Sequence, residues 1–253
     1  GAGVLTAVVN LCIFLAYGTT GSVAAALGAG DLRRAVRLGV DGMWLGAGLG
    51  VALMLIGLVT APWIVTLFDA RPDVAADATA WLRVVSLALP SLLLVLAATG
   101  LLRGLQDTRT PLRVAAAASA ANLLLSWLLV HPLGIGMVGS AWAMVIAQWG
   151  AAAAYAVVVV QSTRRYDAPL LPDREGVRSA ARAAAPLVVR VAAMRLVLLG
   201  STFVAAGIGT ADLAAHQALM AMFGLLALAL DAVAIAAQAI VGRRLGEGDV
   251  AAT

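Results

Sequence analysis

One acidic residue, Asp231, lies deep inside a long apolar stretch of the chain. An ionisable side chain in such a stretch is costly, and it usually has a function or a charged partner. Arg243 follows Asp231 by about 18 Å at the rise of an α-helix, and Arg195 lies about 20 Å beyond Arg182 in the preceding stretch. The two charges are therefore expected at similar depth, and we predict an ion pair between Asp231 and Arg195. The pair could join two helices, bind a cation or contact a ligand.

Other polar side chains lie within the apolar stretches. Gln238 follows Asp231 by about two helical turns, so it shares a helix face with Asp231 and extends a polar stripe towards the interior. Gln148 lies in another stretch, and hydrogen bonds between helices are the alternative explanation for both glutamines. Tyr17, near the end of the first stretch, is expected to line the same interior cavity.

Several kinds of chemistry are excluded or disfavoured by the residue types present. Cys12 is the only cysteine, which excludes a disulfide framework and a cysteine-based zinc site within the chain. The two histidines, His131 and His216, lie far from any carboxylate cluster. The chain contains no GK[ST] phosphate-binding loop and no DDxxD or HxxxD motif, which disfavours ATP-driven pumping and membrane transferase activity. We predict a chain that is not an enzyme and holds no metal or organic cofactor.

These residues belong to a very hydrophobic sequence. Of the 253 residues, 62% are hydrophobic and 12% are charged, whereas about 25% of the residues of a soluble domain are charged. The mean hydropathy is +0.99. The sequence contains seven apolar runs of about 20 to 30 residues each. A helix of this length can cross a bilayer core of about 30 Å, and the runs lack the alternation of barrel strands. We predict an all-α polytopic membrane helix bundle with spans near residues 4–26, 36–61, 78–101, 112–131, 137–161, 184–207 and 213–242.

The arginines indicate how the bundle is oriented. All seventeen basic residues are arginine, and thirteen of them follow the first, third, fifth and seventh runs, whereas the other connections contain only Arg71. Cytoplasmic loops carry the excess of basic residues, so we predict that these four connections are cytoplasmic and that the protein is a multi-pass protein of the inner (plasma) membrane. Asp41 lies one turn from Arg37 near such a connection, which predicts an ion pair at the membrane interface. The arginine clusters contain no interleaved aromatics, so nucleic-acid binding is disfavoured.

The longest connection, residues 162–183, divides the chain into two parts. It contains two prolines and eight charged residues, which predicts a cytoplasmic linker between residues 1–161 and residues 184–253. The second part of the connection could be a surface amphipathic helix or an ordinary polar loop.

A short repeat relates the first and last runs. Residues 23–31 read VAAALGAGD and residues 241–249 read VGRRLGEGD, an offset of 218 residues. If the first and seventh runs are equivalent, six helices form the repeating unit. The chain then holds one lobe without its first helix and the first two helices of the next lobe. Two related bundles around a central binding site are typical of secondary transporters.

The sequence GLLRGLQDTRTPL at residues 100–112, followed by GMVGSAWAMVIAQ at 136–148, resembles the multidrug and toxic compound extrusion (MATE) family. Within it, the chain is similar to the branch named after DNA-damage-inducible protein F. Residues 14–31 and 212–249 support the resemblance, which covers helices 2 to 8 of the family's twelve. It implies a monomeric exporter of organic, often cationic or amphipathic compounds. Such proteins exchange their substrates for H⁺ or Na⁺ by alternating access across the lipid bilayer.

The resemblance also draws attention to Asn122. Relatives in this branch carry an Asn and, four residues later, an Asp on the fifth helix, where they contribute to a cation site. Asn122 matches that pattern, but the second position is Ser126, which cannot titrate. A hydrogen-bonded pair of Asn122 and Ser126 facing the bundle is the structural alternative.

A second function remains open, because related families with the same two-lobe plan move lipids. A flippase for a lipid-linked saccharide or another lipid would be expected to show more cationic residues facing its cavity. Here Arg190 and Arg195 are the available candidates.

Overall fold

The computed structural model describes residue 12, residues 14–66 and residues 72–248. In this part of the chain every regular element is a helix, which confirms the predicted all-α fold class. The start of the first predicted run and Arg71 lie outside the described residues. The helices are α2 (Phe14–Gly28), α3 (Leu32–Thr66), α4 (Pro72–Ser86), α5 (Leu89–Gly104), α6 (Arg109–Val130), α7 (Met137–Arg165), α8 (Arg174–Ile208) and α9 (Thr210–Glu247).

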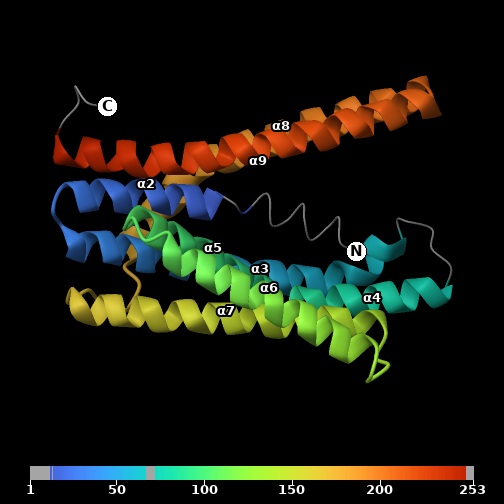
Figure 1. The fold of residues 1–253 in the computed structure, drawn as a ribbon, viewed down its shortest axis with the longest axis horizontal. Helices are drawn as coiled ribbons and strands as arrows, with labels where there is room; N and C mark the ends of the chain where they lie inside the picture. The colour runs from blue at the N-terminus through green and yellow to red at the C-terminus, as the bar shows by residue number, and fades with distance from the viewer. Residues whose placement is uncertain (1–11, 13, 67–71, 249–253) are drawn as a thin grey trace.

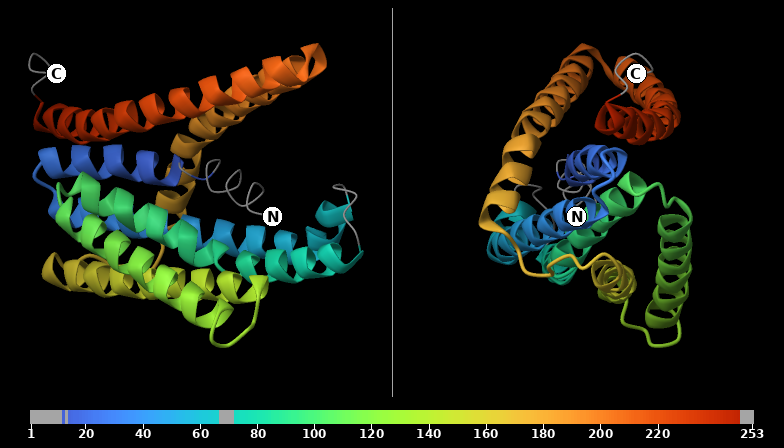
Figure 2. Two further views of the ribbon diagram at one scale, coloured as in Figure 1. Left: turned by 45° about the vertical axis from the view of Figure 1, so that its right-hand side comes forward. Right: turned by 90° about the vertical axis from the view of Figure 1, so that its left-hand side faces the viewer.

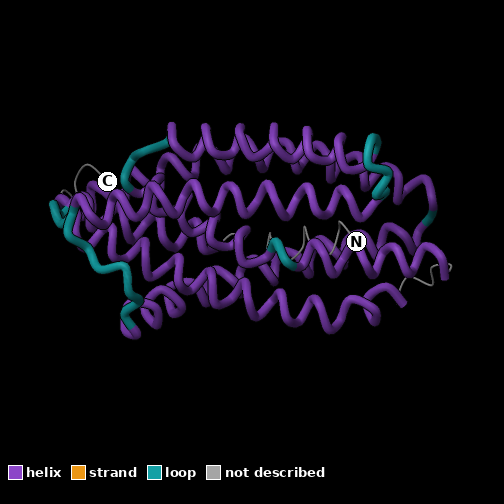
Figure 3. Tube along the Cα trace, turned by 90° about the horizontal axis from the view of Figure 1, so that it is seen from below, coloured by secondary structure: helices purple, strands orange, loops and turns teal. Residues whose placement is uncertain are grey.

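The helices run lengthwise through an elongated molecule, and most of the loops lie at its two ends (Figures 1 and 3). Five helices, α3, α6, α7, α8 and α9, are long and apolar enough to cross a membrane. Helices α4 and α5 add a sixth span that bends by 41°. Most of α6 is exposed, with large apolar side chains such as Leu123 and Trp127 on its surface, as expected of a helix in contact with lipid.

The bend between α4 and α5 divides the run predicted at residues 78–101. Leu87 and Ala88 donate backbone hydrogen bonds to Val84 and Val85, in the tighter i to i−3 pattern. Pro90 stands at the start of α5 and has no N–H to offer a preceding turn. Pro90 therefore removes one backbone hydrogen bond from a continuous helix, and a new helix begins at Leu89.

The connections rich in arginine come together at one end of the molecule, on the left in Figure 1. We call this the arginine-rich end. It contains the α2–α3 turn, the α5–α6 loop, the α7–α8 linker and the last turn of α9. The predicted alternation of arginines along the sequence is thus matched by their gathering in space.

The bundle formed by α2 to α7 has its core around α3. Val23 of α2, Val36 and Val40 of α3, and Leu101 of α5 belong to one buried cluster near the arginine-rich end. Glycines on α3 let the helices approach closely, since a side-chain carbon at Gly39 would overlap the Leu101 side chain. Helix α2 is thereby held against α3 and α5, with its remaining face turned towards α9.

The connection between α7 and α8 is shorter than predicted. Helix α7 continues to Arg165 and α8 begins at Arg174, so the linker comprises residues 166–173 rather than 162–183. The segment considered as a separate surface helix is continuous with α8. The charged side chains at these helix ends lie outside the apolar windows, which explains why hydropathy alone placed the end of α7 too early and the start of α8 too late.

The start of α8 is fastened to α3. The Asp41 carboxylate is 2% exposed and accepts a hydrogen bond from the backbone N–H of Asp173 at 3.0 Å. Arg37 forms an ion pair with Asp173 at 2.7 Å instead of the pair with Asp41 that the sequence predicted. A side chain at Gly176 would overlap the Asp41 carboxylate. An acidic group at a helix N-terminus is favourable because the first N–H groups of the helix lack partners within it.

Helices α2 and α9 meet at the arginine-rich end with almost no side chains between them. Gly28 lies against the backbone carbonyl of Arg243, and Gly246 lies against that of Ala25, so closely that a side-chain carbon at either glycine would overlap the carbonyl. We call this contact the α2–α9 seam. Towards the opposite end, α8 and α9 diverge from the other helices (Figure 2).

The two helices of the seam also end alike. Gly30 after α2 and Gly248 after α9 both have a left-handed backbone, with φ of 76° and 78°. The N–H of each glycine donates to the carbonyl three residues before it, at 3.0 Å to Leu27 and 3.2 Å to Leu245. Only glycine adopts this conformation without strain. The geometry agrees with the repeat identified in the sequence.

Candidate functional site

Asp231 lies where α9 passes Tyr17 of α2. The Tyr17 hydroxyl donates a hydrogen bond to Asp231 Oδ1, and both side chains are partly buried. No ion pair between Asp231 and Arg195 occurs among the described residues, and Arg195 is exposed on α8. The structure therefore gives Asp231 a different partner from the predicted one. The contact joins two helices separated by 214 residues in the chain.

A cavity of about 460 Å³ surrounds this contact. Arg190, rather than Arg195, lines it from α8. Five residues turn an α-helix by about 140°, so the two arginines cannot present their side chains to the same side. The sequence argument compared only the depth of each residue along its helix. It did not compare the faces of α8 on which Arg190 and Arg195 lie, although only one of the two faces can be turned towards Asp231. The apolar part of the wall includes Leu187, Val191 and Val241.

Gln238 lines the same cavity as Asp231, so the two residues share a helix face. Its side-chain Oε1 is buried and has no hydrogen-bond partner among the described residues. A buried carbonyl without a donor is unfavourable by about 1–3 kcal/mol. The cavity wall therefore presents Asp231, Tyr17 and Arg190, while the Gln238 carbonyl is buried within the wall.

Asn122 and Gln148 lie in a second cavity, of about 730 Å³, formed mainly by α5, α6 and α7. The Ser126 hydroxyl donates to Asn122 Oδ1 at 3.1 Å, so these two side chains form the hydrogen-bonded pair that was expected as the structural alternative. Ala232 and Ile235 of α9 close one side of the cavity. Helix α9 thus lines both cavities with different faces.

The predicted site residues fall into three groups. Tyr17, Asp231 and Gln238 share the first cavity, Asn122 and Gln148 share the second with Ser126 bonded to Asn122, and Arg195 lines neither. Two arginines line one cavity each. Arg190, which the sequence analysis considered with Arg195 as a cationic residue facing the cavity, lines the first, and Arg103 lines the second. Arg103 had been counted only as an orientation signal.

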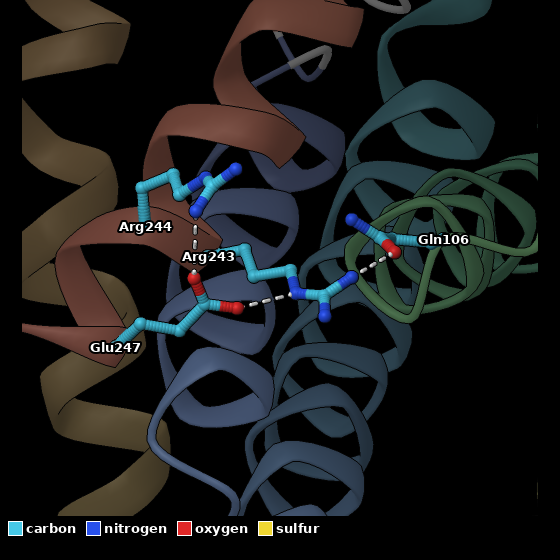
Figure 4. Close-up of polar contacts among 4 residues, drawn as sticks. All are labelled: Gln106, Arg243, Arg244 and Glu247. Carbon is cyan, nitrogen blue, oxygen red and sulfur yellow. Dashed lines mark hydrogen bonds and ion pairs between the residues drawn. The ribbon is translucent and has the colours of Figure 1, made fainter. Parts of the chain in front are cut away.

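A further polar cluster lies at the arginine-rich end and is shown in Figure 4. Arg243 Nη1 donates to Gln106 Oε1 at 2.9 Å, and Arg243 Nε donates to Glu247 Oε1 at 2.8 Å. Arg244 also approaches Glu247, at 3.5 Å. The sequence analysis assigned no role to Gln106, and nothing in its local sequence pointed to a partner 137 residues away.

Asp107, next to Gln106, organises the loop between α5 and α6. Its Oδ1 accepts the backbone N–H groups of Arg109 and Thr110, both at 3.0 Å, and its Oδ2 accepts the Thr110 hydroxyl at 2.6 Å. Partial burial alone would raise the pKa of Asp107, but these hydrogen bonds and the nearby Arg113 guanidinium outweigh it and lower the pKa. Asp107 therefore stays ionised and caps the start of α6.

Comparison with known proteins identifies the fold and the family. The family model MatE matches residues 2–128, which is half of the chain. The chain belongs to the MatE family.

Within the described residues, no group of three or more His, Cys, Asp or Glu side chains is placed to hold a metal ion.

Relatives of the MatE chain occur in plants and bacteria. Protein DETOXIFICATION 44, chloroplastic, of Arabidopsis thaliana is 27% identical over 211 residues, which covers 81% of this chain and 39% of that protein. DNA damage-inducible protein F of Escherichia coli (strain K12) is 26% identical over 253 residues, or 98% of this chain and 55% of that protein.

The fold matches a solved structure described as an outward-facing conformation of a multidrug resistance MATE family transporter. The TM-score is 0.84 at 22% sequence identity, over 98% of this chain and 56% of that chain. The MatE chain thus spans about half the length of these relatives or less. The fold is that of a multi-pass membrane bundle of a transporter family, in its two-lobe architecture, with part of the second lobe.

Proposed function

We propose that this chain is part of a secondary active exporter that moves organic, often cationic or amphipathic compounds in exchange for H⁺ or Na⁺. The observation that carries the proposal is the hydrogen bond from Tyr17 to Asp231. It joins α2 of the first lobe to α9 of the second, and it lies on the wall of a cavity. A group in that position can contact a ligand in the cavity, and its hydrogen bond depends on the relative position of the two lobes.

Coupling follows from the two states of the Asp231 carboxylate. The ionised carboxylate accepts the Tyr17 hydroxyl and keeps α9 against α2 at this depth. A proton or a Na⁺ ion on the carboxylate competes for the same oxygen and weakens the contact. Any ligand that binds one arrangement of the lobes better than the other shifts the population between them. Proton or Na⁺ binding at Asp231 therefore favours separation of the two helices.

The cavity wall supports the choice of substrate. The Asp231 carboxylate suits a cationic group, and the apolar side chains suit a hydrophobic body. A solved relative of the same fold is described as a multidrug resistance transporter. We propose that the protein acts as a monomer in the inner (plasma) membrane, with the arginine-rich end in the cytoplasm, and needs no cofactor other than the coupling ion.

The test uses the protein at its natural full length in inside-out vesicles. Uptake of a fluorescent organic cation is measured under a proton gradient and, separately, under a sodium gradient. We expect uptake under one gradient and its loss, by about tenfold or more, in Asp231→Asn, because the amide neither takes up a proton nor balances the charge of a cation. Asp212→Asn is the matched control, since Asp212 lies exposed in the first turn of the same helix. Equal uptake by wild type and Asp231→Asn would contradict the role of Asp231.

Arg190 is the observation that favours a second candidate, a flippase for a lipid-linked saccharide or another lipid. Its guanidinium lines the same cavity as Asp231 and suits an anionic headgroup. The same vesicles, loaded with a fluorescent anionic lipid, distinguish the two functions. Lipid movement that is lost in Arg190→Gln, together with no cation uptake under either gradient, would replace the exporter by the flippase.

A further inference from the structure

Arg243 of α9 reaches across the arginine-rich end to the loop between α5 and α6. Its guanidinium donates to Gln106 at 2.9 Å and to Glu247, one turn along α9, at 2.8 Å (Figure 4). Glu247 therefore fixes one edge of the guanidinium and leaves another edge directed at the opposite lobe. The hydrogen bond to Gln106 links α9 to the α5–α6 loop across the end of the seam.

The loop that carries Gln106 has a defined backbone conformation. Its backbone is left-handed, with φ of 64°, a conformation that is uncommon for any residue other than glycine. The loop is held in this shape by Asp107, which accepts three hydrogen bonds from Arg109 and Thr110. The backbone that carries the Gln106 side chain is therefore held in place by its own loop, independently of Arg243.

The backbone of Arg243 takes part in the seam as well. Its carbonyl lies against Gly28 of α2, while its side chain extends past α2 to the α5–α6 loop. Because Gly28 has no side chain, α9 approaches closely enough for the guanidinium to reach Gln106. One residue thus combines a close backbone contact between the helices with a polar contact between the lobes.

We propose that Gln106 and Arg243 form a latch that closes the arginine-rich end and must open when the cavity faces that side. The proposal rests on the alternating access proposed above. The Arg243 side chain is 47% exposed, and exposed polar contacts are weak, since water replaces them readily. A weak contact between preformed partners is suited to a gate that opens and closes in each transport cycle.

The test measures how often the seam opens, independently of transport. Ala24 is fully buried in α2 and lies 3.0 Å from the position of a side-chain carbon at Gly242 of α9. A cysteine at Ala24, in a Cys12→Ser background, reacts with a maleimide only when α9 moves away. A cysteine at Ala97, fully buried in α5, serves as the reporter of general unfolding. Labelling rates are measured on the full-length protein in membranes.

We expect Gln106→Asn, which shortens the acceptor and tolerates the left-handed backbone, to raise labelling at position 24 by about threefold. Arg243→Gln should raise it as much or more, and the double variant should add little. Gln106→Glu should lower the rate, because a carboxylate binds the guanidinium more strongly. Arg182→Gln, which removes an exposed arginine from α8, is the matched control and should change nothing.

Unchanged labelling at position 24 in both Gln106→Asn and Arg243→Gln would overturn the latch. An equal increase at position 97 would also overturn it, because the variants would then act by loosening the fold. Absence of driven uptake with the expected labelling pattern would contradict the exporter and leave the latch in place. Normal uptake with unchanged labelling would contradict the latch alone.

Discussion

Two of the contacts that join α8 and α9 to the rest of the molecule are built differently. At the α3–α8 contact, Asp41 is 2% exposed and accepts the N–H of Asp173, the residue before α8, and Arg37 pairs with the Asp173 carboxylate. At the α2–α9 seam, glycines bring two backbones together and the polar contacts are half exposed. The first contact is anchored by a buried carboxylate, whereas the second depends on glycines that bring the two backbones together.

The difference indicates which contact is permanent. Separating Asp41 from its partner would leave a buried charge without a hydrogen bond, which is strongly unfavourable. Separating α2 from α9 exposes glycine surface and breaks contacts that water replaces readily. We therefore expect the start of α8 to stay with α3 during transport, while α9 moves relative to α2.

The largest effect is expected where the α3–α8 contact is broken. Asp41→Ala removes the acceptor for the Asp173 N–H and should lower the free energy of unfolding by about 2–3 kcal/mol. Thermal unfolding in detergent, followed by tryptophan fluorescence, measures the loss. Asp41→Asn retains a carbonyl acceptor and should recover much of it. If Asp41→Ala unfolds at the wild-type temperature, the two contacts are not as different as their burial indicates.

The next effect is expected in the seam. A methyl group at Gly246 would overlap the Ala25 carbonyl, so Gly246→Ala must push the helices apart, at a cost of about 1–2 kcal/mol. Gly48 of α3 has open space around it and provides the control variant Gly48→Ala. Labelling of a cysteine at Ala24 should increase in Gly246→Ala and stay unchanged in Gly48→Ala. Equal labelling of the two variants would show that the seam does not depend on close backbone contact.

The smallest effect is expected from Asp107, in the loop that carries Gln106, and it depends on pH. The lowered pKa of Asp107 means that its charge stabilises the folded loop. This contribution is complete above the pKa of Asp107 in the unfolded chain, which is about 4. It is lost as the pH falls through the lower pKa that Asp107 has in the folded protein. Asp107→Asn should therefore reduce stability by less than about 1 kcal/mol at neutral pH, and the difference from wild type should vanish in strong acid. Unfolding temperatures measured across pH check this, and a difference that grows in acid would contradict it.

The helices were predictable because the bilayer imposes length and hydrophobicity on each span. The gathering of arginines at one end followed from the same constraint. Details that depend on local chemistry were harder to predict. Pro90 lies within a run predicted as one span, and the chain bends just before it. The proline alone could not predict this bend, because α3 and α8 continue through Pro62 and Pro186.

The candidate site was predicted only in part. The shared face of Asp231 and Gln238 follows from helical periodicity, which is a property of the local sequence. The partner of Asp231 does not, because Tyr17 is brought to it by the packing of helices that are remote in sequence. Depth along the helix axis placed Arg195 beside Asp231, and the rotation of α8 placed Arg190 there instead.

The seam is symmetrical at the level of single residues. With the repeat offset of 218 residues, Gly28 is equivalent to Gly246 and Ala25 is equivalent to Arg243. The contact of Gly28 with Arg243 is therefore the counterpart of the contact of Gly246 with Ala25.

Such reciprocity is the defining property of an interface between two copies of one subunit related by a two-fold axis. The position of that axis is marked by Ala24, which packs against its own equivalent, Gly242. In a dimer of identical subunits, both sides would have to carry the same residue. Because one side of this interface has Arg243 where the other has Ala25, a one-sided latch requires two halves whose sequences differ.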